Sequence, residues 1–340
     1  MNVLVVGGTG FVGAHLCREL AERGHHVTAL SRSPDDTAVP LPPEVDRVAG
    51  DATAYDSIEG AFEGQDAVVF LVALSPLFKP SGGYERHYDV HLGGTENAVR
   101  AAKEHGVEKY VQMSALGADP NADTAYIRAK GEADRVVRES GLDWTIFQPS
   151  VIFGEGDEFV GFTKQLAPPY FTPLPGGGKS KFQPIWIGEL AQMFAMAVEG
   201  TVPEAEEGGE AESDDEGEDA PTPAVRRVEN EESEDPHVGR TYEIGGPEVL
   251  TLAEVARLAH AADGKPVNVY PVPMPLAGVG LKLLDNVPGA PMGADQYRSL
   301  KFDNVTTDND VDVFGFEEDE LRTLAEYLGV DPAAAEPGRA

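Results

Sequence analysis

Short apolar runs alternate with amphipathic segments along the first half of the chain. We predict six strands from the apolar runs, at residues 3–6, 26–30, 46–48, 67–72, 109–113 and 144–147. Segments with helical spacing lie between them, at residues 11–23, 55–62, 93–105 and 125–140. A glycine just past each helical segment is expected to close its last turn: Gly24, Gly64, Gly106 and Gly141. This order predicts an α/β fold built on a doubly wound parallel sheet.

The alternation stops near Gly154, and the second half of the chain has a different character. A stretch rich in Gly and Pro runs to residue 181. Beyond it, the pattern predicts strands at residues 183–187 and 240–244. It predicts helices at residues 189–198, 252–262 and 318–328. Thr251 with Glu254 three residues later predicts a capping box at the start of the helix at 252–262.

A strongly charged insert interrupts this second half at residues 201–236. It has too little apolar surface to fold alone, so we expect a disordered loop. Around it, we expect a sheet domain, a smaller C-terminal lobe that meets the substrate or partner, and a flexible tail. The sheet domain comprises residues 1–154 and 182–247, the small lobe residues 155–181 and 248–330, and the tail residues 331–340.

The chain carries 59 acidic and 26 basic side chains, a formal net charge of -33. Such a surface repels nucleic acid and anionic membranes, so simple charge attraction predicts neither as a partner. The acidity is spread over most segments and lysine is scarce, which indicates a halophilic protein. The apolar stretch at 275–284 leaves two alternatives open, packing inside the small lobe or peripheral contact with a membrane or partner.

The amino-terminal residues and the single cysteine indicate the compartment. Met1 leads directly into the first predicted strand, which differs from a secretory signal. No apolar run reaches the roughly 18 residues of a transmembrane helix. Cys17 lies within a helical pattern, where a buried thiol is expected. We therefore expect a cytoplasmic protein.

A glycine-rich turn joins the first strand to the first helix. Gly7, Gly10 and Gly13 have the spacing that permits a tight turn, close approach of a pyrophosphate, and close packing of helix on strand. The N-terminus of the helix would then face the phosphate charge. We expect the residues between the glycines to share this dinucleotide site: Thr9, Phe11 and Val12.

The ends of the second and third strands bear on which dinucleotide binds. Ser31 and Arg32 follow the second strand, and no acid occurs until Asp35. An arginine there suits the 2′-phosphate of NADP(H), whereas an acid would bind the ribose hydroxyl of NAD(H). NADP(H) is therefore favoured, with NAD(H) and a merely solvated Arg32 as the alternatives. Asp51 follows the third strand, where it would accept from the adenine amino group or cap the next turn.

Tyr126 and Lys130 are four residues apart on a predicted helix, so they share one face. A neighbouring ammonium group lowers the pKa of a tyrosine, which allows the phenol to act as a general acid or base. The lysine would also hold the nicotinamide ribose. The histidines show no spacing typical of metal ligands, and we expect no metal site.

Taken together, these motifs resemble the extended and atypical branch of the short-chain dehydrogenase/reductase superfamily, over about residues 1–330. Within it, the chain is most similar to proteins like the nucleotide-binding accessory subunit of respiratory complex I. The resemblance implies a Rossmann domain that binds NADP(H), with the small lobe closing over the nicotinamide end. It also implies further residues of the cofactor site: Ala52, Val72, Ala73 and Pro149.

Three positions depart from the pattern of the active members of that superfamily. His91 stands where they place an asparagine, and Gln148 replaces the arginine of their Arg-Pro pair. Their catalytic serine aligns with Ala115, which leaves Ser114 one position earlier. Adjacent strand residues point to opposite faces, so this offset changes what a serine there can reach.

Two functional hypotheses follow. In the first, the bound NADP(H) serves a structural, assembly or redox-sensing role, as in proteins like the complex I accessory subunit. In the second, the protein is an active NAD(P)-dependent reductase, epimerase or dehydratase. Tyr126 would then be the acid/base, Lys130 would hold the ribose, and Ser114 would polarise the substrate. A small-molecule substrate or a protein complex is the expected partner.

Overall fold

The computed structural model describes residues 1–202, 235–284 and 293–337, and for residues 280–284 it describes the backbone alone. The predicted disordered insert therefore lies mostly outside the described residues. The core is a seven-stranded sheet in the order β11-β6-β5-β4-β1-β2-β3, and every pairing is parallel. The strands are β1 (Asn2–Val6), β2 (His26–Ser31), β3 (Asp46–Ala49), β4 (Ala67–Phe70), β5 (Lys109–Met113), β6 (Asp143–Pro149) and β11 (Arg240–Ile244). The prediction of a doubly wound α/β fold is confirmed.

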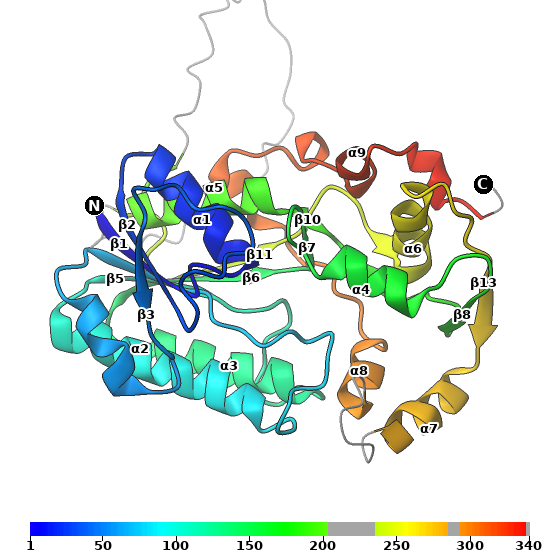
Figure 1. Cartoon of the computed structure of the whole chain (residues 1–340), viewed down its shortest axis with the longest axis horizontal. Helices are drawn as coiled ribbons and strands as arrows, with labels where there is room; N and C mark the ends of the chain where they lie inside the picture. Colours follow the sequence, from blue (N-terminus) through cyan, green and yellow to red (C-terminus); the bar gives the residue numbers. More distant parts are fainter. Residues whose placement is uncertain (203–234, 285–292, 338–340) are drawn as a thin grey trace, which may run out of the picture.

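Helices cover both faces of this sheet (Figure 1). One face packs against α1 (Phe11–Glu22) and α5 (Ile187–Glu199), and the other against α2 (Gly94–His105) and α3 (Ala125–Arg138). Successive side chains of a strand point to opposite faces. Accordingly, Val3 and Val5 belong to the first apolar cluster, while Leu4 and Val6 belong to the second. The near-continuous apolar runs of the sequence are explained by this burial on both sides.

Three predicted helices differ from the observed ones. The segment at 55–62 forms two short 3-10 turns, η1 (Tyr55–Ser57) and η2 (Glu59–Phe62). The helix predicted from residue 93 is preceded by a turn of π-helix, η3 (Tyr88–Gly93), that continues into α2. The C-terminal helix is broken into η5 (Glu318–Glu320) and α9 (Leu324–Leu328), because Thr323 caps a new helix with Glu326.

The remaining elements build a second layer beside the sheet. A parallel pair, β8 (Thr172–Pro175) with β13 (Val269–Val272), lies near α4 (Phe159–Leu166) and α6 (Leu252–Ala261). The predicted capping box is confirmed, since Thr251 Oγ1 accepts from the Glu254 amide at 3.3 Å. Two short pairings replace the predicted strand at 183–187: β7 (Ile152–Phe153) with β10 (Ile185–Trp186), and β9 (Lys181–Phe182) with β12 (Leu250–Thr251).

Two helices and the C-terminal segment complete the described structure. They are α7 (Met274–Leu284), α8 (Ala294–Ser299) and the 3-10 turns η4 (Asp310–Phe314) and η6 (Pro332–Ala335). Val311 and Phe314 return to the core beneath the sheet, although the sequence placed them in the small lobe. Residues 332–335, expected in a flexible tail, instead form η6, where Ala335 O accepts from Arg257 at 3.0 Å. Within the described parts of the chain, no helix is long and apolar enough to cross a membrane.

One buried carboxylate gives the fold a testable dependence on pH. Glu189 in α5 accepts from the Arg322 amide at 2.7 Å. Its other carboxylate oxygen is buried and has no hydrogen-bond partner among the described residues. Burial raises the pKa of Glu189 from 4.5 to about 7. The folded protein therefore binds a proton more tightly than the unfolded chain between these values, and stability falls as the pH rises through them.

We predict that Glu189→Gln removes this dependence. The variant should match the parent protein near pH 4.5 and exceed it by about 1–3 kcal/mol above pH 7, because the neutral amide avoids the desolvation cost. Denaturant unfolding at both pH values measures the difference. Glu22→Gln, on the exposed side of α1, is the control and should change little. Equal stabilisation by Glu189→Gln at both pH values would contradict the prediction.

Candidate dinucleotide site

The carboxyl ends of parallel strands meet at one edge of the sheet, and this edge gathers the predicted site residues. The glycine turn follows β1, Ser31 ends β2, and Asp51 comes shortly after β3. Val72 follows β4, Ser114 follows β5, and Pro149 ends β6. Residues that are far apart in the sequence are therefore placed along a single edge by the order of the strands.

The glycine turn is built by very close packing. Gly7 has φ +93°, a conformation that favours glycine. A Cβ atom on Gly13 would lie 2.1 Å from the Gly7 carbonyl oxygen, so only glycine allows α1 to start this close to β1. Gly10 is the N-cap of α1, and neither a side-chain cap nor an acid occupies its first turn. The positive end of the helix dipole is therefore left for an anionic ligand.

Polar groups at the end of β2 also fit a dinucleotide. Ser31 Oγ is buried and has no hydrogen-bond partner among the described residues. Arg32 is exposed and close enough to Asp51 to help lower the pKa of that carboxyl. The largest cause of this lower pKa is the Thr53 amide, which donates to Asp51 Oδ1 at 2.9 Å. Asp51 thus caps the next turn, and its contact with adenine stays a prediction.

The other predicted cofactor residues differ in exposure. Val72 is half-buried beside Gly7, and Ala73 is exposed at the sheet edge. Ala52 is buried beneath α2, where its carbonyl accepts from Asn97 at 2.9 Å. Pro149 is buried as well, and its carbonyl accepts from the Leu116 amide at 3.2 Å. In this structure Ala73 presents its side chain to solvent, whereas Ala52 and Pro149 support the edge from within.

Tyr126 and Lys130 lie in the first turns of α3, which Thr124 caps by accepting from the Ile127 amide. Lys130 is buried, and its Nζ donates to the Met113 carbonyl at 2.8 Å. Burial lowers the pKa of Lys130 to about 8. Burial also raises the pKa of Tyr126, with a smaller contribution from Asp134. The expectation that Lys130 lowers the pKa of Tyr126 is therefore wrong for this structure, because desolvation of the phenolate dominates.

A buried acid that the sequence analysis missed extends this row. Asp134 lies four residues after Lys130, and its Oδ2 accepts from Gln148 Nε2 at 3.0 Å. Burial raises the pKa of Asp134, and the Ser114 hydroxyl is the largest of the groups that oppose this rise. Neither Ser114 Oγ nor Asp134 Oδ1 makes a hydrogen bond of ordinary geometry among the described residues. The signal in the sequence was the repeated spacing of four residues from Tyr126 to Asp134.

Two histidines pack against the tyrosine ring, one of them the His91 that departs from the pattern of the active members. His87 and His91 are both buried, and their ring centroids lie 5.6 and 5.2 Å from that of Tyr126. The Leu74 amide donates to His91 Nε2 at 3.4 Å, so this nitrogen is an acceptor. Burial lowers the pKa of His87 to about 4 and that of His91 well below its usual value. Both rings are neutral at pH 7.

The protein is similar to known nucleotide-binding proteins along most of its length. The NAD(P)H-binding domain family matches residues 7–165. The chain is 26% identical over 280 residues to "NADH dehydrogenase [ubiquinone] 1 alpha subcomplex subunit 9, mitochondrial" of Arabidopsis thaliana, covering 80% of this chain and 60% of that one. It is 29% identical over 239 residues to a 3 beta-hydroxysteroid dehydrogenase/Delta 5-->4-isomerase of Mycobacterium tuberculosis, covering 62% and 63%.

The solved structure of a nucleoside-diphosphate-sugar epimerase from Staphylococcus aureus shares the fold, with a TM-score of 0.67 at 20% identity. That alignment covers 96% of this chain and 99% of the epimerase. The chain is therefore similar to NAD(P)-binding proteins of the extended short-chain dehydrogenase/reductase kind. The matched region spans about three fifths of the length of the two curated relatives, so their activities are not transferred with it.

The positions that depart from the active members of this family have clear structural roles. Ser114 continues the ladder of β5, since its amide donates to the Phe147 carbonyl at 2.7 Å, and its hydroxyl lies by Asp134. Gln148 uses its amide to hold that same carboxyl. His91 belongs to the π-helical turn η3, and its Nδ1 is buried without a partner among the described residues.

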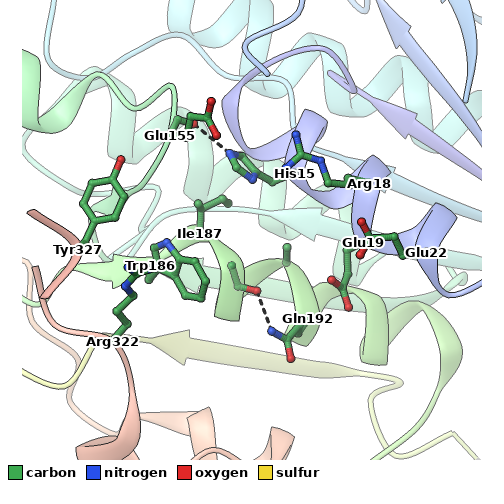
Figure 2. Close-up of a pocket in the computed structure, with 12 residues that line it drawn as sticks. His15, Arg18, Glu19, Glu22, Glu155, Trp186, Ile187, Gln192, Arg322 and Tyr327 are labelled. Atoms are coloured by element: carbon green, nitrogen blue, oxygen red, sulfur yellow. Dashed lines mark hydrogen bonds between the residues drawn. The ribbon is translucent and has the colours of Figure 1, made fainter. Parts of the chain in front are cut away.

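A separate cavity of about 380 Å³ lies between α1, α5 and the C-terminal segment (Figure 2). Arg322 stacks there on Trp186, with 4.7 Å between the guanidinium carbon and the ring centroid. His15 Nε2 pairs with the Glu155 carbonyl at 2.9 Å. None of the predicted dinucleotide residues lines this cavity, and the polar contacts seen in it are between protein groups. It is not the predicted cofactor site.

We predict that Gly13→Ala strongly weakens dinucleotide binding. The added methyl group must push α1 away from Gly7, a distortion of the kind that costs about 1–3 kcal/mol, which corresponds to roughly tenfold or more in affinity. Titration with NADPH measures the effect. Gly60→Ala is the control, since its Cβ would meet no atom within 4 Å. Unchanged affinity in Gly13→Ala would show that the ligand does not depend on this packing.

Proposed function

We propose that the protein binds NADP(H) and uses the bound cofactor structurally or as a redox sensor. The observation that carries this proposal is the combination of an uncapped α1 N-terminus with the unpartnered Ser31 hydroxyl and the exposed Arg32. The helix end suits the pyrophosphate, and the two side chains suit the 2′-phosphate that distinguishes NADP(H) from NAD(H). NAD(H) remains the alternative ligand.

The local chemistry favours binding over catalysis. The phenol of Tyr126 has a raised pKa, which makes it a poor proton donor near neutral pH. The Ser114 hydroxyl lies by the buried Asp134 carboxyl, one position before the serine expected of active members. In place of the usual asparagine, His91 fills the space beside Tyr126 with a neutral ring.

The similarity to an NADH dehydrogenase subunit supports a protein complex as the setting of this function. In that setting the cofactor would stabilise the sheet edge and the adjoining lobe, which the N-terminal and C-terminal residues build together. We propose in addition that the protein is cytoplasmic and adapted to high salt, in line with its net charge of -33. A protein complex and a small molecule both remain as proposed partners.

The second candidate is an NAD(P)-dependent oxidoreductase or an epimerase or dehydratase. It is favoured by the row of Tyr126, Lys130 and Asp134 along one face of α3. Bound NADPH would supply or accept a hydride. Asp134 favours the ammonium form of Lys130, which would hold a ribose of the cofactor. The Tyr126 hydroxyl would transfer a proton.

We predict that Arg32→Ala selectively weakens NADPH binding. The loss of a charge-assisted contact to the 2′-phosphate is worth about 1.5–3 kcal/mol, or tenfold and more in affinity. NADH affinity should hardly change. Nicotinamide fluorescence in high salt follows both titrations, and Arg100→Ala, an exposed arginine on α2, is the control. Equal loss of NADPH and NADH affinity would remove the basis for NADP(H) preference, and no binding of either would overturn the proposal.

Tyr126→Phe separates the two candidates. If the protein only binds its cofactor, Tyr126→Phe should keep its affinity for NADPH within about twofold. Neither the parent protein nor the variant should then turn over any ketone or nucleotide sugar in a test panel. Absorbance of NADPH at saturating cofactor reports turnover. Turnover by the parent protein that Tyr126→Phe abolishes, with unchanged cofactor affinity, would establish the enzyme instead.

A further inference from the structure

One end of the molecule lacks the acidity that dominates the rest of the chain. Residues 159–182 contain three lysines and neither Asp nor Glu, and residues 264–279 contain one lysine and no acid. The chain as a whole has a net charge of -33. These two stretches include α4, β8, β13 and the first turns of α7, which lie at the end of the molecule away from the N-terminus (Figure 1).

The same end exposes large apolar side chains. Phe171 and Leu276 are 60% and 64% exposed, and Val279 is 59% exposed. Tyr270 is also exposed, and its ring centroid lies 4.6 Å from that of Phe171. Leu276 and Val279 are three residues apart in α7, so they share one face of the helix. Single exposed apolar residues are ordinary, but a cluster of them indicates a contact surface.

Packing contacts join these residues to exposed lysines. The loop after β8 packs on the start of α7, since a Cβ on Gly176 would lie 3.2 Å from Met274 Sδ. Gly278 of α7 faces the ring of Tyr297 in α8, and Lys301 lies over that ring with Nζ 4.5 Å from its centroid. Ser180 Oγ donates to the Leu300 carbonyl, so Lys179 and Lys301 each flank a residue of this hydrogen bond, and the exposed Phe302 follows Lys301.

We call these exposed residues together the α7 surface, defined by Phe171, Lys179, Tyr270, Leu276, Val279, Lys301 and Phe302. Two carboxylates border it. Asp263 pairs with Lys164 at 3.1 Å and with Lys265 at 3.6 Å, and Asp303 accepts from the Lys181 amide. These acids are engaged by neighbouring groups, so the α7 surface itself presents apolar and cationic side chains.

We propose that the α7 surface docks the protein onto an anionic lipid bilayer. Aromatic and aliphatic side chains of this kind enter the boundary between headgroups and acyl chains, while lysines beside them meet the anionic headgroups. The two stretches that expose Phe171, Tyr270, Leu276 and Val279 contain no carboxylate, which matches that environment. The repulsion expected from the overall charge acts on other faces and is screened beyond about 10 Å at moderate salt.

A second copy of the chain fits this surface less well. A two-fold dimer brings the same patch of both copies together, so Lys179 and Lys301 of one copy would approach those of the other. Such a contact places like charges near each other, and the bordering carboxylates Asp263 and Asp303 are already engaged within their own copy. Anionic headgroups supply the missing negative charge.

Docking would also orient the nucleotide site. The helix α8 that carries Tyr297 towards the α7 surface also carries Asp295, whose Oδ2 accepts from the Ala125 amide at 2.8 Å at the start of α3. Tyr126 follows directly. The α7 surface is thereby tied to the nicotinamide end of the proposed site by one short helix, although the docking proposal does not depend on catalysis.

Sedimentation of the full-length protein with vesicles tests the proposal. In about 0.15 M salt, we expect binding to phosphatidylglycerol vesicles and much weaker binding to phosphatidylcholine vesicles. Leu276→Asp with Val279→Asp should reduce the partition coefficient about tenfold or more. Lys179→Glu with Lys301→Glu should reduce binding to phosphatidylglycerol vesicles and leave binding to phosphatidylcholine vesicles unchanged. Val202→Asp, at an exposed valine beyond α5, and Arg100→Glu with Arg135→Glu, on α2 and α3, are the matched controls.

Thermal melts and NADPH titrations of each variant separate lipid binding from folding and from the proposed cofactor function. The melting temperature and the affinity for NADPH should not change. The proposal is overturned if the parent protein does not bind phosphatidylglycerol vesicles, or if the controls lose as much binding as the α7 variants. It is also overturned if sedimentation velocity shows a dimer that Leu276→Asp with Val279→Asp dissociates while vesicle binding is unaffected. That result would make the α7 surface an interface between copies.

Discussion

The contact between Gly13 and the Gly7 carbonyl oxygen controls the geometry of the nucleotide site. A Cβ atom at Gly13 would lie 2.1 Å from that oxygen, so the first helix starts closer to the first strand than any other residue would permit. This packing directs the amide groups of the first turn of α1 to the edge where the other six strands of the sheet also end. The side chains of Ser31 and Arg32 reach the same edge because β2 pairs with β1 in register.

Burial governs the chemistry on the opposite side of this edge. Tyr126, Lys130 and Asp134 repeat at four-residue spacing along α3. Lys130 reaches the end of β5 and Asp134 reaches Gln148 in β6, whereas Tyr126 packs on His87 and His91. Desolvation raises the pKa of the tyrosine and of the acid, and it lowers that of the lysine. Burial therefore opposes charge on all three groups of this row, which is the physical argument behind the proposed binding role.

Charge is distributed unevenly over the molecule. The acids that give a net charge of -33 are absent from residues 159–182 and 264–279, and there the exposed side chains are aromatic, aliphatic or lysine. The α7 surface and the nucleotide edge are connected through α8, which contributes Asp295 to the start of α3. An arrangement of this kind allows the protein to meet a lipid or protein surface at one end and a cofactor at the centre.

The sequence alone determined the seven strands of the main sheet, the glycine turn and the capping box at Thr251, because each depends on residues close together in the chain. It also located the arginine at the end of β2. Only the tertiary structure decided that burial raises the pKa of Tyr126 and that Ser114 lies by Asp134. It likewise brought Phe171 beside Tyr270 and Ser180 to the Leu300 carbonyl, across about a hundred residues of chain. Desolvation and contacts between distant segments depend on how the elements pack, and local patterns along a chain do not encode that packing.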